Sequence, residues 1–222
     1  MTTKQLLPQI FWFRIAAPCV RVEDIPHLTD PIRLLDLPET CALPDFSPLE
    51  GQSGWAEVRL GWNARGLGIT VVADGLSDQQ LVRDRPEGFA VVNLWVDTRD
   101  TRNVNRATKF CHRFMARLEV TGPRQQLSVD VTQRPIARAL ADAPICRPQV
   151  IETRVEVGRS GWVLELFLPA SALNGFDPDT NRRLGFAYQI ADHIRDDQFL
   201  GVGREFPLGE NPSLWSTIEL RD

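Results

Sequence analysis

The chain has 222 residues, of which 43% are hydrophobic and 24% charged, an ordinary globular composition. Its 25 lysines and arginines and 29 aspartates and glutamates leave a formal charge of −4, which excludes a uniformly basic nucleic-acid coat. No run approaches the roughly 20 apolar residues of a membrane helix. The four cysteines are widely spaced, without a C-x-x-C pair, so we expect reduced thiols in a cytoplasmic protein with no membrane or nucleic-acid partner.

The first 54 residues combine an apolar run with a proline-rich stretch. The run is interrupted by Pro8, Gln9 and Arg14, which disfavours an export signal, and residues 10–16 are predicted as a first strand. Six prolines between 18 and 54 disfavour long helices and central strands. Because the stretch also carries many leucines and isoleucines, we expect it to wrap around the domain.

From residue 55 the pattern becomes that of β-strands. Residues 55–62 alternate between polar and apolar side chains, a turn follows at 63–66, and 67–73 is rich in β-branched residues, which together predict a hairpin. The strand at 88–97 has the clearest alternation of all. Further strands are predicted at 110–118, 125–131, 150–157, 161–168, 184–193 and 214–220. Short helical turns are predicted at 135–141 and 169–173.

About ten closely spaced strands with almost no helix predict an all-β protein. The architecture expected from this pattern is a single antiparallel β-sandwich, jelly-roll-like, with few short helices. No repeat, low-complexity tract or change of composition marks a boundary. We therefore expect one domain over residues 1–222, with the wrapping segment in 1–54 and the core in 55–220.

Four segments, in this order, resemble the strand motifs of carbohydrate-binding module family 9-like, or DOMON-like, β-sandwiches. They are VRLGW…GLGITVVAD at 58–74, EGFAVVNLWVDTR at 87–99, GWVLELFLP at 161–169, and LGFAYQIAD at 184–192 with PSLWSTIEL at 212–220. The resemblance implies a jelly-roll-like sandwich with a concave face that binds a saccharide in some members. The chain departs from the pattern at Glu87, where aspartate is usual, and in a basic insert at 97–110. The aromatic pair that clamps the sugar in binding members is not identified.

The concave face is the predicted ligand site. A saccharide docks its C–H faces on an aromatic ring, while amide and carboxylate groups bond its hydroxyls. Trp95 and Asn93 share the face opposite the aliphatic side of their strand. The predicted contacts are Asn93, Trp95, Asp97, His112, Glu165 and Tyr188. The alternative is a face closed by loops or by residues 18–54, since both strand faces carry large apolar groups; the chain would then be a protein-interaction or structural domain.

The segment 97–117 is the most unusual in charge. It holds six arginines and lysines against Asp97 and Asp100. Because the guanidinium fork matches carboxylate and phosphate oxygens, a rim for an anionic small ligand is predicted at Arg99, Arg102 and Arg106. The alternatives are a solvated loop whose arginines pair with nearby acids, or a contact surface for a protein partner. No aromatic side chains are interleaved as a stacking platform, so no nucleic acid is predicted.

No cofactor, metal site or catalytic residue is predicted. His112 and His193 lack the close spacing of a metal site. An alternative Ca²⁺ site at a strand end comprises Asp192, Asp196 and Asp197. G-x-S-x-G, P-loop and dinucleotide motifs are absent from the sequence. A hydrolase built on the sandwich is the remaining alternative, because sequence does not give the separation of two carboxylates.

Overall fold

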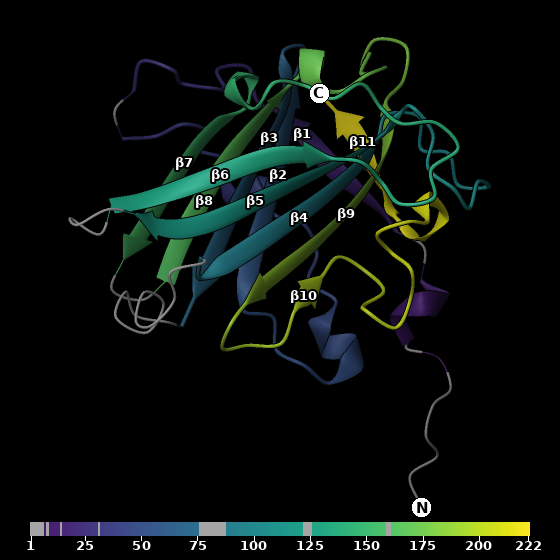
Figure 1. Cartoon of the computed structure of the whole chain (residues 1–222), viewed down its shortest axis with the longest axis horizontal. Coiled ribbons are helices and arrows are strands. Elements are labelled where there is room, and N and C mark those ends of the chain that lie inside the picture. Colours follow the sequence, from purple (N-terminus) through teal and green to yellow (C-terminus); the bar gives the residue numbers. More distant parts are fainter. Residues whose placement is uncertain are drawn as a thin grey trace, which may run out of the picture.

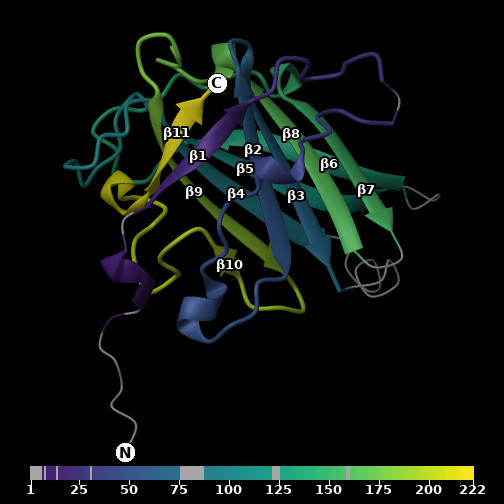
Figure 2. The same cartoon turned by 180° about the vertical axis from the view of Figure 1, so that it is seen from behind.

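The computed structural model describes residues 7, 9–13, 15–30, 32–75, 88–121, 126–158 and 161–222 (Figures 1 and 2). Eleven strands form one sheet in the order β6-β5-β4-β9-β11-β1-β2-β3-β8-β7, and β10 pairs with β9 beside this path. Helices in the described residues are short 3-10 turns, and none is long and apolar enough to cross a membrane. The all-β prediction is confirmed.

The strands are β1 (Ala16–Arg21), β2 (Ala56–Asn63), β3 (Gly66–Asp74), β4 (Ala90–Asp97), β5 (Cys111–Thr121), β6 (Gln126–Arg134), β7 (Glu152–Gly158), β8 (Gly161–Pro169), β9 (Arg183–Asp192), β10 (Gln198–Phe199) and β11 (Ser216–Arg221). The 3-10 helices are η1 (Gln9–Trp12), η2 (Glu39–Cys41), η3 (Ser47–Glu50), η4 (Pro148–Val150), η5 (Ala170–Ala172) and η6 (Pro212–Leu214).

The sheet curls until it is nearly closed. Strands β6, β5, β4 and β9 form a front layer, and the other long strands lie behind it (Figures 1 and 2). The two end strands, β6 and β7, come into contact where the ring almost closes. Hydrogen bonding thus runs through one continuous sheet, and the separation into the two sheets of a jelly-roll sandwich stays a prediction.

The space between the layers holds the main apolar core. Alternate residues of each long strand point into it. In β4 these are Val92, Leu94 and Val96, and in β8 they include Leu164 and Leu166, each at most 1% exposed. Burying an aliphatic side chain of this size contributes roughly 1.5–3 kcal/mol. The residues between them point outward, which places the side chains of the candidate site on the outer face of the sheet.

Two glycines allow the β3–β8 pairing to form. Gly66 begins β3 and Gly161 begins β8. A Cβ at position 66 would lie 2.1 Å from the carbonyl oxygen of Leu168, and one at 161 would lie 1.9 Å from that of Ala73. Since these are backbone atoms of the partner strand, a larger residue would push the strands apart.

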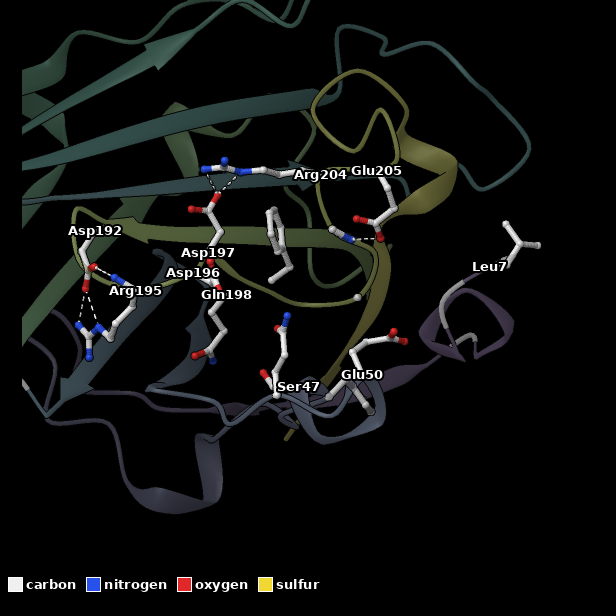
Figure 3. Close-up of a pocket in the computed structure, with 15 residues that line it drawn as sticks. Leu7, Ser47, Glu50, Asp192, Arg195, Asp196, Asp197, Gln198, Arg204 and Glu205 are labelled. Carbon is white, nitrogen blue, oxygen red and sulfur yellow. Dashed lines mark hydrogen bonds and ion pairs between the residues drawn. The ribbon is translucent and has the colours of Figure 1, made fainter. Parts of the chain in front are cut away.

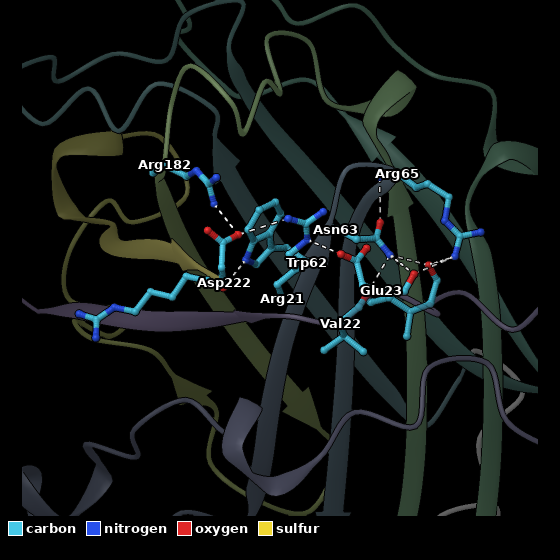
Figure 4. A network of polar contacts seen from close by, with 10 residues as sticks. Arg21, Val22, Glu23, Trp62, Asn63, Arg65, Arg182 and Asp222 are labelled. Atoms are coloured by element: carbon cyan, nitrogen blue, oxygen red, sulfur yellow. Dashed lines mark hydrogen bonds and ion pairs between the residues drawn. The ribbon is translucent and has the colours of Figure 1, made fainter.

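Apolar side chains of residues 25–30 and 32–41 lie on the outer face of β8. Ile25, Leu35 and Leu37 pack there on Phe167 in a separate apolar cluster. Polar contacts hold the start of this segment (Figure 4). Among them, Asn63 Nδ2 donates to the carbonyl oxygen of Ile25 at 2.7 Å. The wrapping of the domain by the whole segment 18–54 stays a prediction.

Three sequence predictions about local structure are wrong. The strand predicted over 10–16 is replaced by a 3-10 helix at Gln9–Trp12, and β1 begins only at Ala16; residue 14 lies outside the described residues. β1 contains Pro18 and yet lies inside the sheet, parallel to both β11 and β2, so the sheet is mixed rather than antiparallel. Pro18 is tolerated because β1 pairs with β2 only through Val20 and Arg21. Residues 135–141 form turns, with no helix.

Candidate functional site

Strand register defines a row of residues on the outer face of the front layer. Asn93 of β4 lies directly opposite Met115 of β5 and Gln189 of β9. The row continues to Thr132 of β6, opposite Met115, and to Phe199 of β10, opposite Gln189. The residues flanking Asn93 point into the core, so this row faces outward. We call these five residues the central row.

A chain of hydrogen bonds crosses the sheet along the central row. Arg113 donates from Nη2 to Oδ1 of Asn93 at 3.1 Å, and Asn93 Nδ2 donates to Oε1 of Gln189 at 3.3 Å. Gln189 Nε2 in turn donates to Oδ2 of Asp197. Arg204 donates to the same oxygen at 2.7 Å. Each polar group is thus oriented by the next, from β5 to the loop beyond β10.

The hydrogen-bond chain ends at a cleft of about 690 Å³. η3 forms one wall and residues 192–205 form the other (Figure 3). Asp197 and Arg204 stand on one side, with Ser47 and Glu50 opposite them. Two aromatic side chains also line it, Phe46 and Phe199. The cleft therefore offers polar walls together with an apolar contact, as small-molecule sites commonly do.

The cleft is negatively charged overall. Five carboxylates and two guanidinium groups line it: Glu50, Asp192, Asp196, Asp197, Glu205, Arg195 and Arg204. An excess of carboxylates repels an anion and leaves many acceptors for hydroxyl groups. The cleft by itself suits a neutral, hydroxyl-rich ligand.

Gln198 joins the two walls of the cleft. Its Oε1 accepts from the backbone N–H groups of Trp55 (2.8 Å) and Ala56 (2.9 Å), and its Nε2 donates to the Ala56 carbonyl oxygen (2.7 Å). Trp55 Nε1 donates to the carbonyl oxygen of Asp196 at 2.8 Å, and the guanidinium of Arg195 lies 3.7 Å from the Trp55 ring. A second hollow of about 460 Å³ extends the cleft along Trp55. The walls are therefore held in place before any ligand arrives.

Of the predicted saccharide contacts, Asn93 and Trp95 lie on this outer face. Asn93 takes part in the hydrogen-bond chain. Trp95 is 3% exposed and packs with Leu208 and Trp215 in an outer apolar cluster, beneath the segment 200–215. Within the part of the chain that the structure describes, its Nε1 has no hydrogen-bond partner. Trp95 is therefore covered and is not an open platform for a sugar ring, contrary to the prediction.

His112 and Tyr188 point to the opposite side of the sheet, into the core. His112 is 1% exposed, and burial lowers its pKa to about 4. Tyr188 is 2% exposed, and burial raises its pKa to about 12. Because successive strand residues face opposite sides, neither can share a surface with Asn93. The prediction that His112 and Tyr188 form one binding site with Asn93 is therefore wrong.

Glu165 and Asp97 hold the backbone of the chain itself. Glu165, in the other layer, accepts from the backbone N–H groups of residues 34–36, the first at 2.9 Å from Leu34. Asp97 accepts from the backbone N–H groups of Arg99 (2.9 Å) and Thr101 (2.7 Å). Burial raises the pKa of Asp97. Both carboxylates anchor loops, and Glu165 is remote from the outer face of β4.

The predicted anion rim lies at the far end of β4 from the cleft. Its members are Arg99, Arg102 and Arg106. They contact, respectively, the ring of Phe110 at 4.8 Å, the carboxylate of Asp100 at 3.3 Å and the carbonyl oxygen of Arg138 at 2.7 Å. β4 spans about 23 Å between its two ends. These arginines therefore form no common surface with the cleft.

Sequence reasoning missed Arg113, Gln189, Asp197 and Arg204 as members of the site. The first two could have been found by strict alternation, because each sits between two buried residues of its strand. No periodic signal marks Asp197 and Arg204, which belong to loops.

No group of three or more side chains able to hold a metal occurs in the described part of the chain. Asp192 and Asp197, two of the proposed Ca²⁺ ligands, are paired with arginines.

Comparison with protein-family models gives no match, and neither does comparison with curated proteins. Among solved structures, the chain is similar to a carbohydrate binding module of family 9 from Caldicellulosiruptor kristjanssonii, in complexes with cellotriose and with glucose. Both matches have 16% identity, a TM-score of 0.49 and 75% coverage of this chain, with 74% and 76% of the respective module chains covered. The matched structures are thus family 9 modules, as the strand motifs indicated; the DOMON-like part of the resemblance stays a prediction.

Proposed function

We propose that the chain is a non-catalytic binding domain, a single β-sandwich module, that takes a saccharide on the central row and in the adjoining cleft. The observation that carries this proposal is the hydrogen-bond chain from Arg113 to Arg204, which crosses an outer sheet face and ends in the 690 Å³ cleft.

The chemistry of the site matches that of a sugar. A saccharide presents hydroxyl groups that each donate and accept, and amide side chains such as Asn93 and Gln189 can do both. Because these groups are already oriented by one another, binding loses little side-chain freedom. Phe199, directly opposite Gln189, supplies apolar contact for the C–H face of a ring.

Binding is favoured over hydrolysis by the state of the cleft carboxylates. A glycosidase needs one carboxyl group to protonate the leaving oxygen and a second to act as base or nucleophile. Asp192 accepts from the backbone and side chain of Arg195, and Asp197 accepts from Arg204 and Gln189. Both oxygens of Asp192 and Oδ2 of Asp197 are thus engaged within the protein, so these atoms serve as fixed acceptors.

Protein interaction is a second candidate function. The burial of Trp95 closes part of the predicted face, and an aromatic run near the N-terminus is exposed, with Trp12 at 67% and Phe13 at 57%. Large exposed aromatic groups in a cluster mark contact surfaces. Replacing both with serine is expected to leave sugar binding unchanged if the saccharide proposal is right.

Titration calorimetry with glucose, cellotriose and other neutral saccharides tests the main proposal. We expect saturable heat with the wild-type protein and affinity about tenfold lower in Gln189→Ala and Asn93→Ala, since each removes hydrogen bonds worth about 1 kcal/mol. Asp130→Ala, an exposed change on the neighbouring strand β6, is the matched control and should bind as the wild type does. Absence of heat with every saccharide, from a protein that melts cooperatively, overturns the proposal.

A further inference from the structure

Two arginines face each other on the outer surface of the front layer. Arg113 of β5 lies directly opposite Arg134 of β6 in the antiparallel register. Side chains in this position have Cβ atoms about 4.5–5.5 Å apart, and like charges there are destabilising. Burial, and then the charge of Arg134, lower the pKa of the Arg113 guanidinium. A negative charge placed between the two guanidinium groups would remove this repulsion.

No carboxylate of the described residues neutralises this pair. Neither Arg113 nor Arg134 takes part in an ion pair within the described ranges. Four residues further along β5, by contrast, Arg117 lies opposite Asp130 and contacts Glu119 at 3.5 Å. The same strand face therefore carries one compensated and one uncompensated arginine.

Two buried donors beside the pair also lack partners among the described residues. They are Arg113 Nε and Thr132 Oγ1. Thr132 belongs to the central row, and the Arg113 guanidinium lies 5.6 Å from the covered ring of Trp95, directly opposite it. A buried donor left without an acceptor is destabilising. Both groups can donate and Arg113 Nε cannot accept, so the atoms that would satisfy them are acceptor oxygens.

We propose that the saccharide bound at this face carries an oxyanion, either a carboxylate or a phosphate, held between Arg113 and Arg134. This inference rests on the proposed function and names its ligand class. The planar guanidinium forks match the paired oxygens of both groups. The sugar ring then lies over Asn93 and Gln189, one row away, and its hydroxyl end points toward the acidic cleft, which repels the anion.

Calorimetry at matched low ionic strength tests this with four probes: glucose, glucuronate, glucose 6-phosphate and inorganic phosphate. We expect at least one anionic sugar to bind about tenfold or more tightly than glucose, with a preference that shrinks at 0.5 M NaCl because salt screens a half-exposed pair. In Arg134→Gln the preference should be lost while glucose binding stays. Arg117→Gln is the matched control and should keep the preference.

Each result decides between the two proposals. Equal affinity for glucose and both anionic sugars overturns the oxyanion inference and leaves the saccharide proposal standing. Failure of all three sugars to bind overturns the oxyanion inference, and the saccharide proposal is then decided by cellotriose and the other neutral saccharides of the first titration. Binding of inorganic phosphate as tightly as glucose 6-phosphate makes this an anion site with no sugar requirement, which also overturns the inference. Thermal unfolding of Arg134→Gln, expected at or above the wild-type temperature because a like charge is removed, verifies that the variant is folded.

Discussion

His112 illustrates how burial determines what one residue can do. Its Nδ1 accepts from Gln133 Nε2 at 3.2 Å, and its Nε2 lies 3.4 Å from the Asn174 carbonyl oxygen. The Gln133 amide is itself fixed, because it donates to the Pro144 carbonyl oxygen and accepts from the Cys146 N–H. A proton on Nδ1 would face the amide N–H, so the neutral ring fits the site and the charged ring does not.

The stability of the protein should therefore fall as the pH falls through the range of this histidine. The pKa of His112 is lowered from 6.5 to about 4. Between these values the unfolded chain binds a proton that the folded chain does not, so acid favours unfolding. We expect the free energy of unfolding to drop by on the order of 3 kcal/mol from pH 7 to pH 4.

Urea denaturation at pH 7, 5.5 and 4 measures this, with His112→Gln compared at each pH. The variant should lose less stability than the wild type over the same interval, because carboxylates titrate in both proteins and only the wild type has the buried imidazole. His27→Gln, in the surface segment before Pro31, is the matched control. Parallel pH profiles for wild type and His112→Gln contradict the assignment.

At the scale of elements, the seam between β3 and β8 depends on the glycines that begin each strand. The two strands pair over their whole length, from Gly66 with Pro169 to Asp74 with Gly161. This pairing joins the hairpin β2–β3 to the hairpin β7–β8, which are distant in sequence. A defect at either end of the seam thus weakens the attachment of one hairpin to the other.

Gly161→Ala is expected to destabilise the protein by at least about 2–3 kcal/mol, the cost of forcing atoms into a filled space. The new Cβ would lie 1.9 Å from the carbonyl oxygen of Ala73. Gly158→Ala, in the same hairpin, meets one atom of the described residues, the Gly161 carbonyl oxygen at 3.9 Å, and should change stability little. Thermal unfolding of both variants measures the difference, and equal melting temperatures would show that the seam adapts.

At the scale of the whole molecule, the cleft is built by segments that are far apart in the chain. Gln198, 4% exposed, connects the β10 wall to Trp55 and Ala56 across more than 140 positions. The shape of the site therefore depends on tertiary contacts rather than on either segment.

Gln198→Ala is expected to remove about 3 kcal/mol of stability, because the buried N–H and carbonyl groups of Ala56 and the partly buried N–H of Trp55 lose their partner. Hydrogen exchange of residues 46–56 should become faster, and saccharide affinity should fall with the loosened wall. Gln52→Ala, an exposed glutamine on the same wall, is the control for exchange and stability. Unchanged exchange at 46–56 would mean that this wall is held by other contacts.

The prediction of the fold succeeded where strand alternation is strong and failed where it is weak. Hairpins at 56–74 and 152–169 follow from local alternation and turn glycines. The first strand was predicted at 10–16, whereas β1 begins at Ala16. The apolar run 10–16 has no alternation that would mark a strand, and the prolines that follow it disfavour a strand inside a sheet. Pro18 can nevertheless lie in an inner strand, because β1 pairs with β2 only through residues beyond Pro18.

The sequence by itself determined an all-β protein, the alternation that places Asn93 and Trp95 on one face of β4, and the absence of standard catalytic motifs. Those features follow from local backbone geometry and residue chemistry. Only the tertiary structure decided which faces are covered, that His112 and Tyr188 point inward, and that Arg113 meets Arg134. The reason is physical: alternation divides a strand into two faces, but long-range pairing and packing decide what lies against each face.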